Sequence, residues 1–392
     1  MQSCSRWYLA VLLQTVLLLS TVTSARSQQL WTPTGSLSQP RLQTTGTLLN
    51  DGRVLLAGSL TCNPGCFSYP TAEVYDPTAR SWTSTAPLHV ARFNHVAVAL
   101  PGGKALVAGG YLTPGVLTET CEIYDPATGL WSLTGSLSTP RQFHQAVALT
   151  NGKVLVVGGL GTNGQGGFAT LASAELYDPA TGQWSPAGLL GTARFLHTVT
   201  LLADGRVLVT GGAATNASGQ NVPPLASAEL YDPAANRWTG ATAMSTGRTG
   251  HAAIVLSNGQ VLVTGGFGVS GVPSHTTELY DPTKDQWAPA ARMRVPRADH
   301  TVTLLPSGKV LAVGGWGNWV VSEVYDPAGG SWSPAAELNE GRASHSATLL
   351  KDGVLLVAGG IDSDNTYLTS AELLDLTRRP LGPRRPNEHS QP

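Results

Sequence analysis

Short runs of β-branched and aliphatic residues alternate with turn residues along almost the whole chain, and the alternation recurs seven times. The clearest copy spans residues 194–238. It reads Arg-x-x-His, an apolar run, Asp-Gly, a second apolar run, Gly-Gly, a variable segment, Glu-x-Tyr-Asp-Pro and finally Trp. The step between copies is about 45–54 residues, which is typical of propeller blades rather than of helical repeats.

Each copy predicts four short strands. The two apolar runs are rich in β-forming residues, and the two residues between them tolerate positive φ, so the runs form a hairpin. Those pairs are Asp51-Gly52, Gly102-Gly103, Asn151-Gly152, Asp204-Gly205, Asn258-Gly259, Ser307-Gly308 and Asp352-Gly353. The Glu-x-Tyr segment predicts a third strand, after which Asp-Pro begins a turn, because Asp accepts backbone hydrogen bonds and Pro presets φ. The Trp, seven residues behind the Tyr, lies on a fourth strand.

The positions of the tryptophans indicate how the ring closes. The last copy contains Glu372 and Asp375 but has no Trp behind them, whereas Trp31 precedes the first copy. We expect the residues near Trp31 to supply the outer strand of the last blade, because such closure leaves no open blade. The chain is therefore predicted to be all-β, with a seven-bladed propeller over residues 29–378.

These recurring elements resemble the kelch-repeat family, which includes the propeller of galactose oxidase and many bacterial kelch proteins. The resemblance rests on six Tyr-Asp-Pro units, on the Trp behind each, and on the Gly-Gly pairs. The pairs are 109–110, 158–159, 211–212, 265–266, 314–315 and 359–360, with Gly58-Ser59 in the first copy. The resemblance implies the fold but not the function, because kelch propellers include enzymes, carbohydrate binders and protein-interaction scaffolds.

Net charge limits the kinds of partner that are expected, and the ends of the chain carry signals for localisation and disorder. Only 12% of the 392 residues are charged and the formal net charge is −1, which argues against a nucleic-acid partner. Arg6, an apolar stretch over 7–19 and Ala25 predict a secretory signal at 1–25, so we expect an extracellular or periplasmic protein. No later run is long and apolar enough to span a membrane. The Pro- and Arg-rich tail, 379–392, is predicted to be disordered.

Three cysteines follow the predicted signal. Cys62 and Cys66 bracket a tight Asn-Pro-Gly loop, and in a secreted protein we interpret them first as a disulfide. We interpret Cys121 as a buried thiol, with a bridge to one of that pair as the alternative. After the last Gly-Gly, Asp362 and Asp364 could hold Ca²⁺, and the alternative is a plain polar turn. No other metal and no cofactor is predicted.

The segments after Gly-Gly vary in length and share one face of the predicted propeller with the Arg-x-x-His segments, and variable loops on a rigid scaffold usually carry function. They also hold most aromatics that the repeat does not use: Phe67, Tyr69, Tyr111, Phe168, Phe267, Trp316, Trp319 and Tyr367. Phe93, Phe143 and Phe195 lie in the Arg-x-x-His segments. Exposed aromatics suit sugar stacking or a protein hot spot, and the alternative is that they pack between blades. Trp316 and Trp319 share the shortest loop, which offers little else to bury them.

The Arg-x-x-His segments allow two interpretations. Six imidazoles near a channel mouth could bind metal, and seven guanidinium groups could bind an anion. These residues recur once per blade, however, and a Glu recurs equally often, so buried Arg–Glu ion pairs that tie strands or neighbouring blades are the alternative. The residues are Arg41, Arg92, Arg141, Arg194, Arg248, Arg297 and Arg342; His95, His144, His197, His251, His300 and His345, with Thr44 in the first copy; and Glu73, Glu122, Glu175, Glu229, Glu278, Glu323 and Glu372.

Two classes of function stay open. A binding module needs only a stiff scaffold with one diverse, aromatic face, and it would hold a protein or a glycan. A carbohydrate-active enzyme would resemble either the kelch-type sugar epimerases and mutarotases or galactose oxidase. The latter resemblance implies a Cys–Tyr crosslink and a Tyr beside a His, and this chain has no adjacent Tyr-His pair. We favour the binding module, since the sequence offers no unique acid/base pair.

Overall fold

The computed structural model describes residues 30–62, 66–112, 115–162, 167–216, 220 and 222–377, with only the backbone at residues 61, 62 and 66. Contacts group Gln29–Arg378 into one compact unit. The predicted signal at 1–25 and the predicted disordered tail at 379–392 lie outside the described residues. Within the described residues there are strands, bridges and turns but no helix, and therefore no helix that could cross a membrane.

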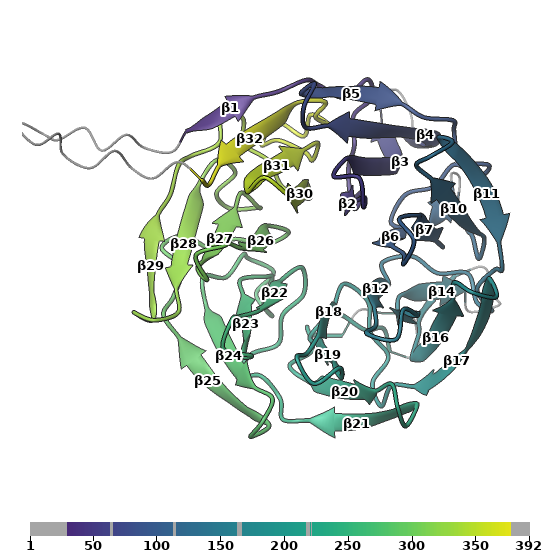
Figure 1. Ribbon diagram of the computed structural model, residues 1–392. Coiled ribbons are helices and arrows are strands. Elements are labelled where there is room, and N and C mark those ends of the chain that lie inside the picture. Colours follow the sequence, from purple (N-terminus) through teal and green to yellow (C-terminus); the bar gives the residue numbers. More distant parts are fainter. Residues whose placement is uncertain are drawn as a thin grey trace, which may run out of the picture. The chain divides into compact units, whose positions relative to one another are not determined.

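Seven four-stranded antiparallel sheets stand around a central axis, which confirms the predicted seven-bladed propeller (Figure 1). The inner strands are β2 (Thr47–Leu48), β6 (Val96–Ala99), β12 (Gln145–Ala148), β18 (Thr198–Leu201), β22 (Ala252–Val255), β26 (Thr301–Leu304) and β30 (Ser346–Leu349). The second strands are β3 (Val54–Cys62), β7 (Ala105–Ala108), β13 (Val154–Val157), β19 (Val207–Thr210), β23 (Val261–Thr264), β27 (Val310–Val313) and β31 (Val354–Ala358).

The third strands carry the Glu-x-Tyr motif, and the outer strands carry the Trp. The third strands are β4 (Cys66–Asp76), β10 (Cys121–Asp125), β16 (Ser173–Asp178), β20 (Ala228–Asp232), β24 (Thr277–Asp281), β28 (Ser322–Asp326) and β32 (Ala371–Asp375). The outer strands are β5 (Ser81–Ser84), β11 (Leu130–Thr134), β17 (Gln183–Leu189), β21 (Arg237–Ala241), β25 (Gln286–Ala290), β29 (Ser331–Pro334) and β1 (Trp31–Pro33). Two small hairpins, β8 (Tyr111–Leu112) with β9 (Val116–Leu117) and β14 (Leu160–Thr162) with β15 (Phe168–Thr170), follow Gly-Gly in the second and third blades.

The last blade is completed from the opposite end of the chain. β1 pairs with β32, so that Trp31 faces Leu374 in the order β1-β32-β31-β30 (Figure 1). The indole Nε1 of Trp31 donates to the carbonyl of Ala336 in the preceding blade at 3.0 Å. Trp184 and Trp238 donate in the same way to carbonyls of their own preceding blades. Trp31 therefore fills the repeat position that the last copy lacks, and the predicted closure by an N-terminal strand is confirmed.

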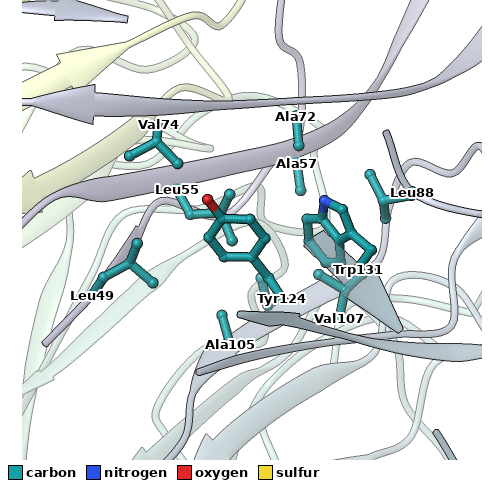
Figure 2. Packing of buried hydrophobic residues seen from close by; sticks show 11 residues of the cluster. Leu49, Leu55, Ala57, Ala72, Val74, Leu88, Ala105, Val107, Tyr124 and Trp131 are labelled. Carbon is teal, nitrogen blue, oxygen red and sulfur yellow. The ribbon is translucent and has the colours of Figure 1, made fainter. Parts of the chain in front are cut away.

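The core lies between blades rather than within one sheet. In the cluster of Figure 2, Tyr124 and Trp131 of the second blade pack against Leu55 and Val74 of the first. The seven-residue spacing places each Tyr directly across from its Trp on neighbouring strands, as for Tyr124 and Trp131. The six Tyr–Trp ring pairs have centroids 5.0–5.2 Å apart. Because each blade buries an apolar face against the next, the ring provides a rigid frame for the loops at its ends.

The first blade departs from the pattern after Gly58. There, β3 and β4 continue as a longer hairpin, with a register shift between Ala57 and Ser59. The hydroxyl of the buried Ser59 accepts a hydrogen bond from the backbone N–H of Leu42 at 3.2 Å. In the second blade the corresponding N–H, that of Phe93, donates to the backbone carbonyl of Tyr111. Ser59 thus substitutes for a backbone acceptor in the one copy that lacks Gly-Gly.

Candidate functional site

The Arg-x-x-His segments and the segments after Gly-Gly lie side by side at one end of the propeller. In five blades, the residue after Arg forms an antiparallel bridge with the residue after Gly-Gly, as in Phe93–Tyr111 and Ala298–Trp316. The sixth such bridge, at the same motif position, joins Gln142 and Leu160. We call the end formed by these segments the loop face. The opposite end carries the hairpin turns and the Asp-Pro turns, linked by surface ion pairs such as Lys153–Asp178 at 3.1 Å.

Each arginine of the motif is buried against the glutamate of its own copy. The seven N···O distances are 2.7–3.2 Å. In the fourth blade, Arg194 also donates to the carbonyls of Gly211 and Ser227, while the backbone N–H of Gly191 donates to Glu229. Burial lowers the pKa of the Arg194 guanidinium, and Glu229 opposes that shift. These arginines are committed to the frame and are not available to an anionic ligand.

Six of the seven arginine segments also tie two blades together. The side chain of Arg194 bonds to the fourth blade, whereas its backbone carbonyl accepts from Gly159 of the third blade at 2.9 Å. The same bond to the preceding blade is made by the carbonyls of Arg41, Arg141, Arg248, Arg297 and Arg342. The Arg–Glu unit therefore holds the crossover from one blade to the next.

The six motif histidines line a cavity at the channel mouth but are themselves buried and uncharged. Burial, and next the nearby arginine, lowers the pKa of His95, His251 and His345 to about 3. The pKa values of His144, His197 and His300 are also well below the ordinary value, again mainly because of burial. Several bond to threonine, as His300 Nε2 does to Thr264 Oγ1 at 2.8 Å. Among the described residues, no three His, Cys, Asp or Glu side chains gather as metal ligands.

A ring of seven residues, each directly before the histidine position of its copy, surrounds this cavity of ≈ 480 Å³. All seven have a left-handed backbone, with φ of 48–60°. Six backbone hydrogen bonds of 2.8–3.4 Å join them in the order Asn94, Phe143, Leu196, Gly250, Asp299, Ser344 and Gln43. We call this set the mouth ring. Its scaffold is repeated, but its side chains are all different, so the mouth is chemically asymmetric.

Asp299 stands out in the mouth ring. It is the only carboxylate among the residues that line the cavity, and in the described part of the chain its side chain has no hydrogen-bond or ion-pair partner. Burial raises the pKa of its carboxyl to about 6. The side chain lies over Gly250, where a Cβ would meet Asp299 Oδ1 at 2.5 Å. The sequence analysis did not single out Asp299. A signal for it was present, because only one of the six motif histidines, His300, directly follows an acidic residue.

The predicted aromatics form one pair, Phe143 and Phe195 with ring centroids 6.5 Å apart, two further groups and several single positions. Phe93, Tyr111 and Phe168 make one group, in which the ring centroid of Tyr111 lies 5.2 Å from that of Phe93 and 6.1 Å from that of Phe168. Trp316 and Trp319 lie 4.6 Å apart and pack with Tyr367 on the buried Leu42, Ala343 and Ile361. The expectation that their short loop has little to bury them is therefore wrong, because neighbouring segments supply the packing. Tyr69 and Phe267 are partly buried, and Phe67 is exposed.

The cysteine and calcium predictions have different outcomes. Cys121 is a free, buried thiol whose pKa burial raises to about 12, so the alternative bridge to the first-blade pair is not formed. Cys62 and Cys66 face each other in the backbone register of the hairpin, but their side chains, and hence the predicted disulfide, lie outside the described residues. Asp362 Oδ1 accepts the N–H groups of Asp364 and Thr366, as in a polar turn. Calcium binding there stays a prediction.

Comparison with known proteins agrees with this architecture. A human protein, Kelch-like protein 33, is 35% identical over 102 residues, which are 26% of this chain and 18% of the human protein. The chain thus spans less than a fifth of that relative. A solved structure described as a novel fungal alcohol oxidase of the AA5 family in complex with copper superimposes with a TM-score of 0.69 at 17% identity, covering 88% of this chain and 76% of the oxidase. At that identity the likeness shows the fold alone.

The sequence of more than half the chain also matches a known family. Residues 94–315 match the family described as the KLHDC2/KLHL20/DRC7 Kelch-repeats domain. Those residues run from the mouth ring of the second blade to the Gly-Gly pair of the sixth. With its repeated Gly-Gly, Tyr-Asp-Pro and Trp elements, the chain belongs to the kelch-repeat family of β-propeller proteins.

Proposed function

We propose that this chain is a secreted binding module that holds a protein partner against its loop face. The observation that carries the proposal is the distribution of exposed apolar side chains. Of the ten large hydrophobic residues that are exposed among the described residues, six follow Gly-Gly, or Gly58-Ser59 in the first copy, on the loop face: Phe67, Val116, Phe168, Val269, Val272 and Val320. Concentration of apolar surface on one face is typical of an interaction site.

The loop of the fifth blade offers the most exposed part of this surface. Val269 and Val272 are 75% and 60% exposed, and they line a hollow of ≈ 620 Å³ together with Pro273 and the segment before Arg248. Kelch propellers are typical protein-interaction domains, and a rigid hollow with apolar walls suits an inserted side chain of a partner. The arginines that an epimerase-like mechanism would use beside its acid/base groups are held by glutamates, which supports binding over catalysis.

Two matched double variants test the loop face. Val269→Ser with Val272→Ser removes apolar surface there, and Leu130→Ser with Leu133→Ser removes side chains that are 58% and 59% exposed on the outer strand β11. A partner captured by crosslinking from the organism's own secreted proteins is then measured against purified propeller. We expect at least a tenfold loss of affinity for the loop variant alone, with unchanged melting for both. Loss confined to the β11 variant contradicts the proposal, and a glycan-array ligand that depends on the loop variant would favour a glycan instead.

Secretion is the second part of the proposal and is tested separately. It is supported by Arg6, the apolar stretch over 7–19 and the small residues that end at Ala25. Expression of the full chain should release a mature protein that begins at Arg26, as read by amino-terminal sequencing of the extracellular or periplasmic fraction. An uncleaved chain that stays in the cytoplasm would contradict it.

A further inference from the structure

The cavity inside the mouth ring has a single uncompensated charge. Its lining contains no lysine and no arginine, because the seven motif arginines are turned away into their glutamate pairs. The six lining histidines are uncharged near neutral pH, since burial depresses their pKa values. That leaves the carboxylate of Asp299, which is ionised above about pH 6. A charged group that is partly desolvated and has no partner is costly, and such groups mark candidate functional sites.

The surroundings of Asp299 leave its carboxylate open to the cavity. Its neighbour on one side of the mouth ring is Gly250, which has no side chain to cover it. Its neighbour on the other side is Ser344, followed by Gln43. These two side chains carry oxygen atoms that can accept further hydrogen bonds. One arc of the ring therefore offers a carboxylate and neutral polar oxygens, which suits a cationic donor.

The far side of the ring carries an apolar pair. Phe143 and the polar Asn94 each lie three positions from Asp299 around the seven-membered ring, which is as far across the mouth as the ring allows. Leu196 lies next to Phe143 on the side away from Asn94. Both side chains line the cavity. A ligand that crosses the mouth thus meets a hydrocarbon surface on one side and a carboxylate on the other. This pattern suits an aliphatic stem that ends in a positive charge.

We propose that the mouth ring receives a primary ammonium group on an aliphatic stem, with Asp299 as its counter-ion and with Phe143 and Leu196 against the stem. The inference rests on the proposed function, and it makes the ammonium part of the bound protein: either a lysine side chain or a free amino terminus. The cavity of ≈ 480 Å³ has the size of ordinary small-ligand pockets, so it admits one such group. A concave site with one negative charge also concentrates cations from solution.

The test uses small probes that separate charge from stem. N-acetyl-lysine methylamide is titrated into the purified propeller at pH 7.5, with N-acetyl-norleucine methylamide, which has the same four-carbon stem without the ammonium group, as the neutral analogue. Trialanine amide, with and without amino-terminal acetylation, represents a free amino terminus. We expect one amine to bind at least tenfold more tightly than its neutral counterpart, and the amine that does so identifies the source of the ammonium group. Equal binding of charged and neutral probes, or no binding of either amine, overturns the inference.

Two variants connect the probe to the carboxylate. Asp299→Asn keeps the shape and suits the left-handed backbone, since Asn94 occupies the same ring position in the second blade. Asp364→Asn removes an exposed carboxylate elsewhere on the loop face. We expect amine binding to fall at least tenfold in the first variant and to be unchanged in the second, and amine binding that survives Asp299→Asn overturns the proposal. If the partner still depends on Val269 and Val272 while the amine probes fail, only the ammonium site is refuted.

Discussion

At the scale of single residues, the Gly-Gly pair is explained by the neighbours that leave no room for a side chain. A Cβ on Gly211 would lie 2.6 Å from the carbonyl oxygen of Arg248 and 2.6 Å from Cε1 of His251, both in the next copy. A Cβ on Gly212 would meet the Cβ of His197 in its own copy. The two glycines and the histidines thus form one packing unit that recurs around the ring.

This packing predicts different costs at two glycines with the same kind of backbone. Gly211 and Gly259 both have positive φ, but a Cβ on Gly259 would meet nothing within 4 Å. Gly259→Ala should cost about 1–2 kcal/mol of unfolding free energy, from the backbone conformation alone. Gly211→Ala should cost roughly 1–3 kcal/mol more, because atoms of the next blade must move. Urea denaturation of both variants measures the difference, and equal costs would refute the packing explanation.

Asp299 predicts a pH-dependent gain of stability on neutralisation. The folded state raises the pKa of this carboxyl from 3.8 to about 6, so the charged form is disfavoured by folding and stability is lost as pH rises through that window. Asp299→Asn should therefore stabilise the propeller by roughly 1–3 kcal/mol at pH 7.5. The gain should vanish below about pH 4, where the carboxyl is protonated in both states.

The six histidines that share the cavity do not obscure this measurement. Folding lowers their pKa values, to about 3 for His95, His251 and His345, so stability falls with pH as the unfolded imidazoles take up protons, but it falls equally in the wild type and the variant. Melting temperatures of the wild type and the variant, recorded from pH 4 to pH 8, follow the titration. A difference in melting temperature that does not change with pH would show that the Asp299 carboxyl is not perturbed by folding.

At the scale of elements, the Arg–Glu unit joins the second and third strands of a blade to the segment that enters it. Arg194→Ala leaves the buried Glu229 without its cation, and we expect a loss of roughly 3–5 kcal/mol. Arg206→Ala breaks a half-exposed pair with Asp204 in the same blade, and we expect a change within about 1 kcal/mol. Thermal unfolding distinguishes the two variants. Equal melting temperatures would mean that the buried pair is not a structural tie.

Sequence reasoning succeeded for these elements because each repeat carries its own signals. The Asp-Gly turn, the Tyr-to-Trp spacing and the unpaired Trp31 are all local, and they were enough to predict strands, blades and closure. The packing of Trp316 was missed because it depends on Leu42, which is 274 positions away in the chain. Asp299 was missed for a different reason. It stands at the position directly before the histidine, where the side chain differs in every copy, so the shared pattern of the repeats does not point to it.

At the scale of the whole molecule, the ring depends on a single short strand, β1, that joins the two ends of the propeller. Trp31 is buried in the cluster between the sixth and seventh blades, with Leu338 and Leu374, and its indole bonds to Ala336. Removing it would leave a cavity and loosen the pairing of β1 with β32, which would expose the edge of β32 to other chains.

Trp31→Ala should therefore destabilise the whole propeller by roughly 3–5 kcal/mol rather than one blade alone, because both neighbouring blades lose packing. Leu30→Ala is the matched control, since Leu30 is the adjacent residue and its side chain is exposed. Urea denaturation measures the loss, and light scattering at rising protein concentration reports association through the freed edge of β32. Wild-type stability in the Trp31 variant would mean that the remaining strands hold the ring closed without β1, and that closure by the N-terminal strand contributes little to stability.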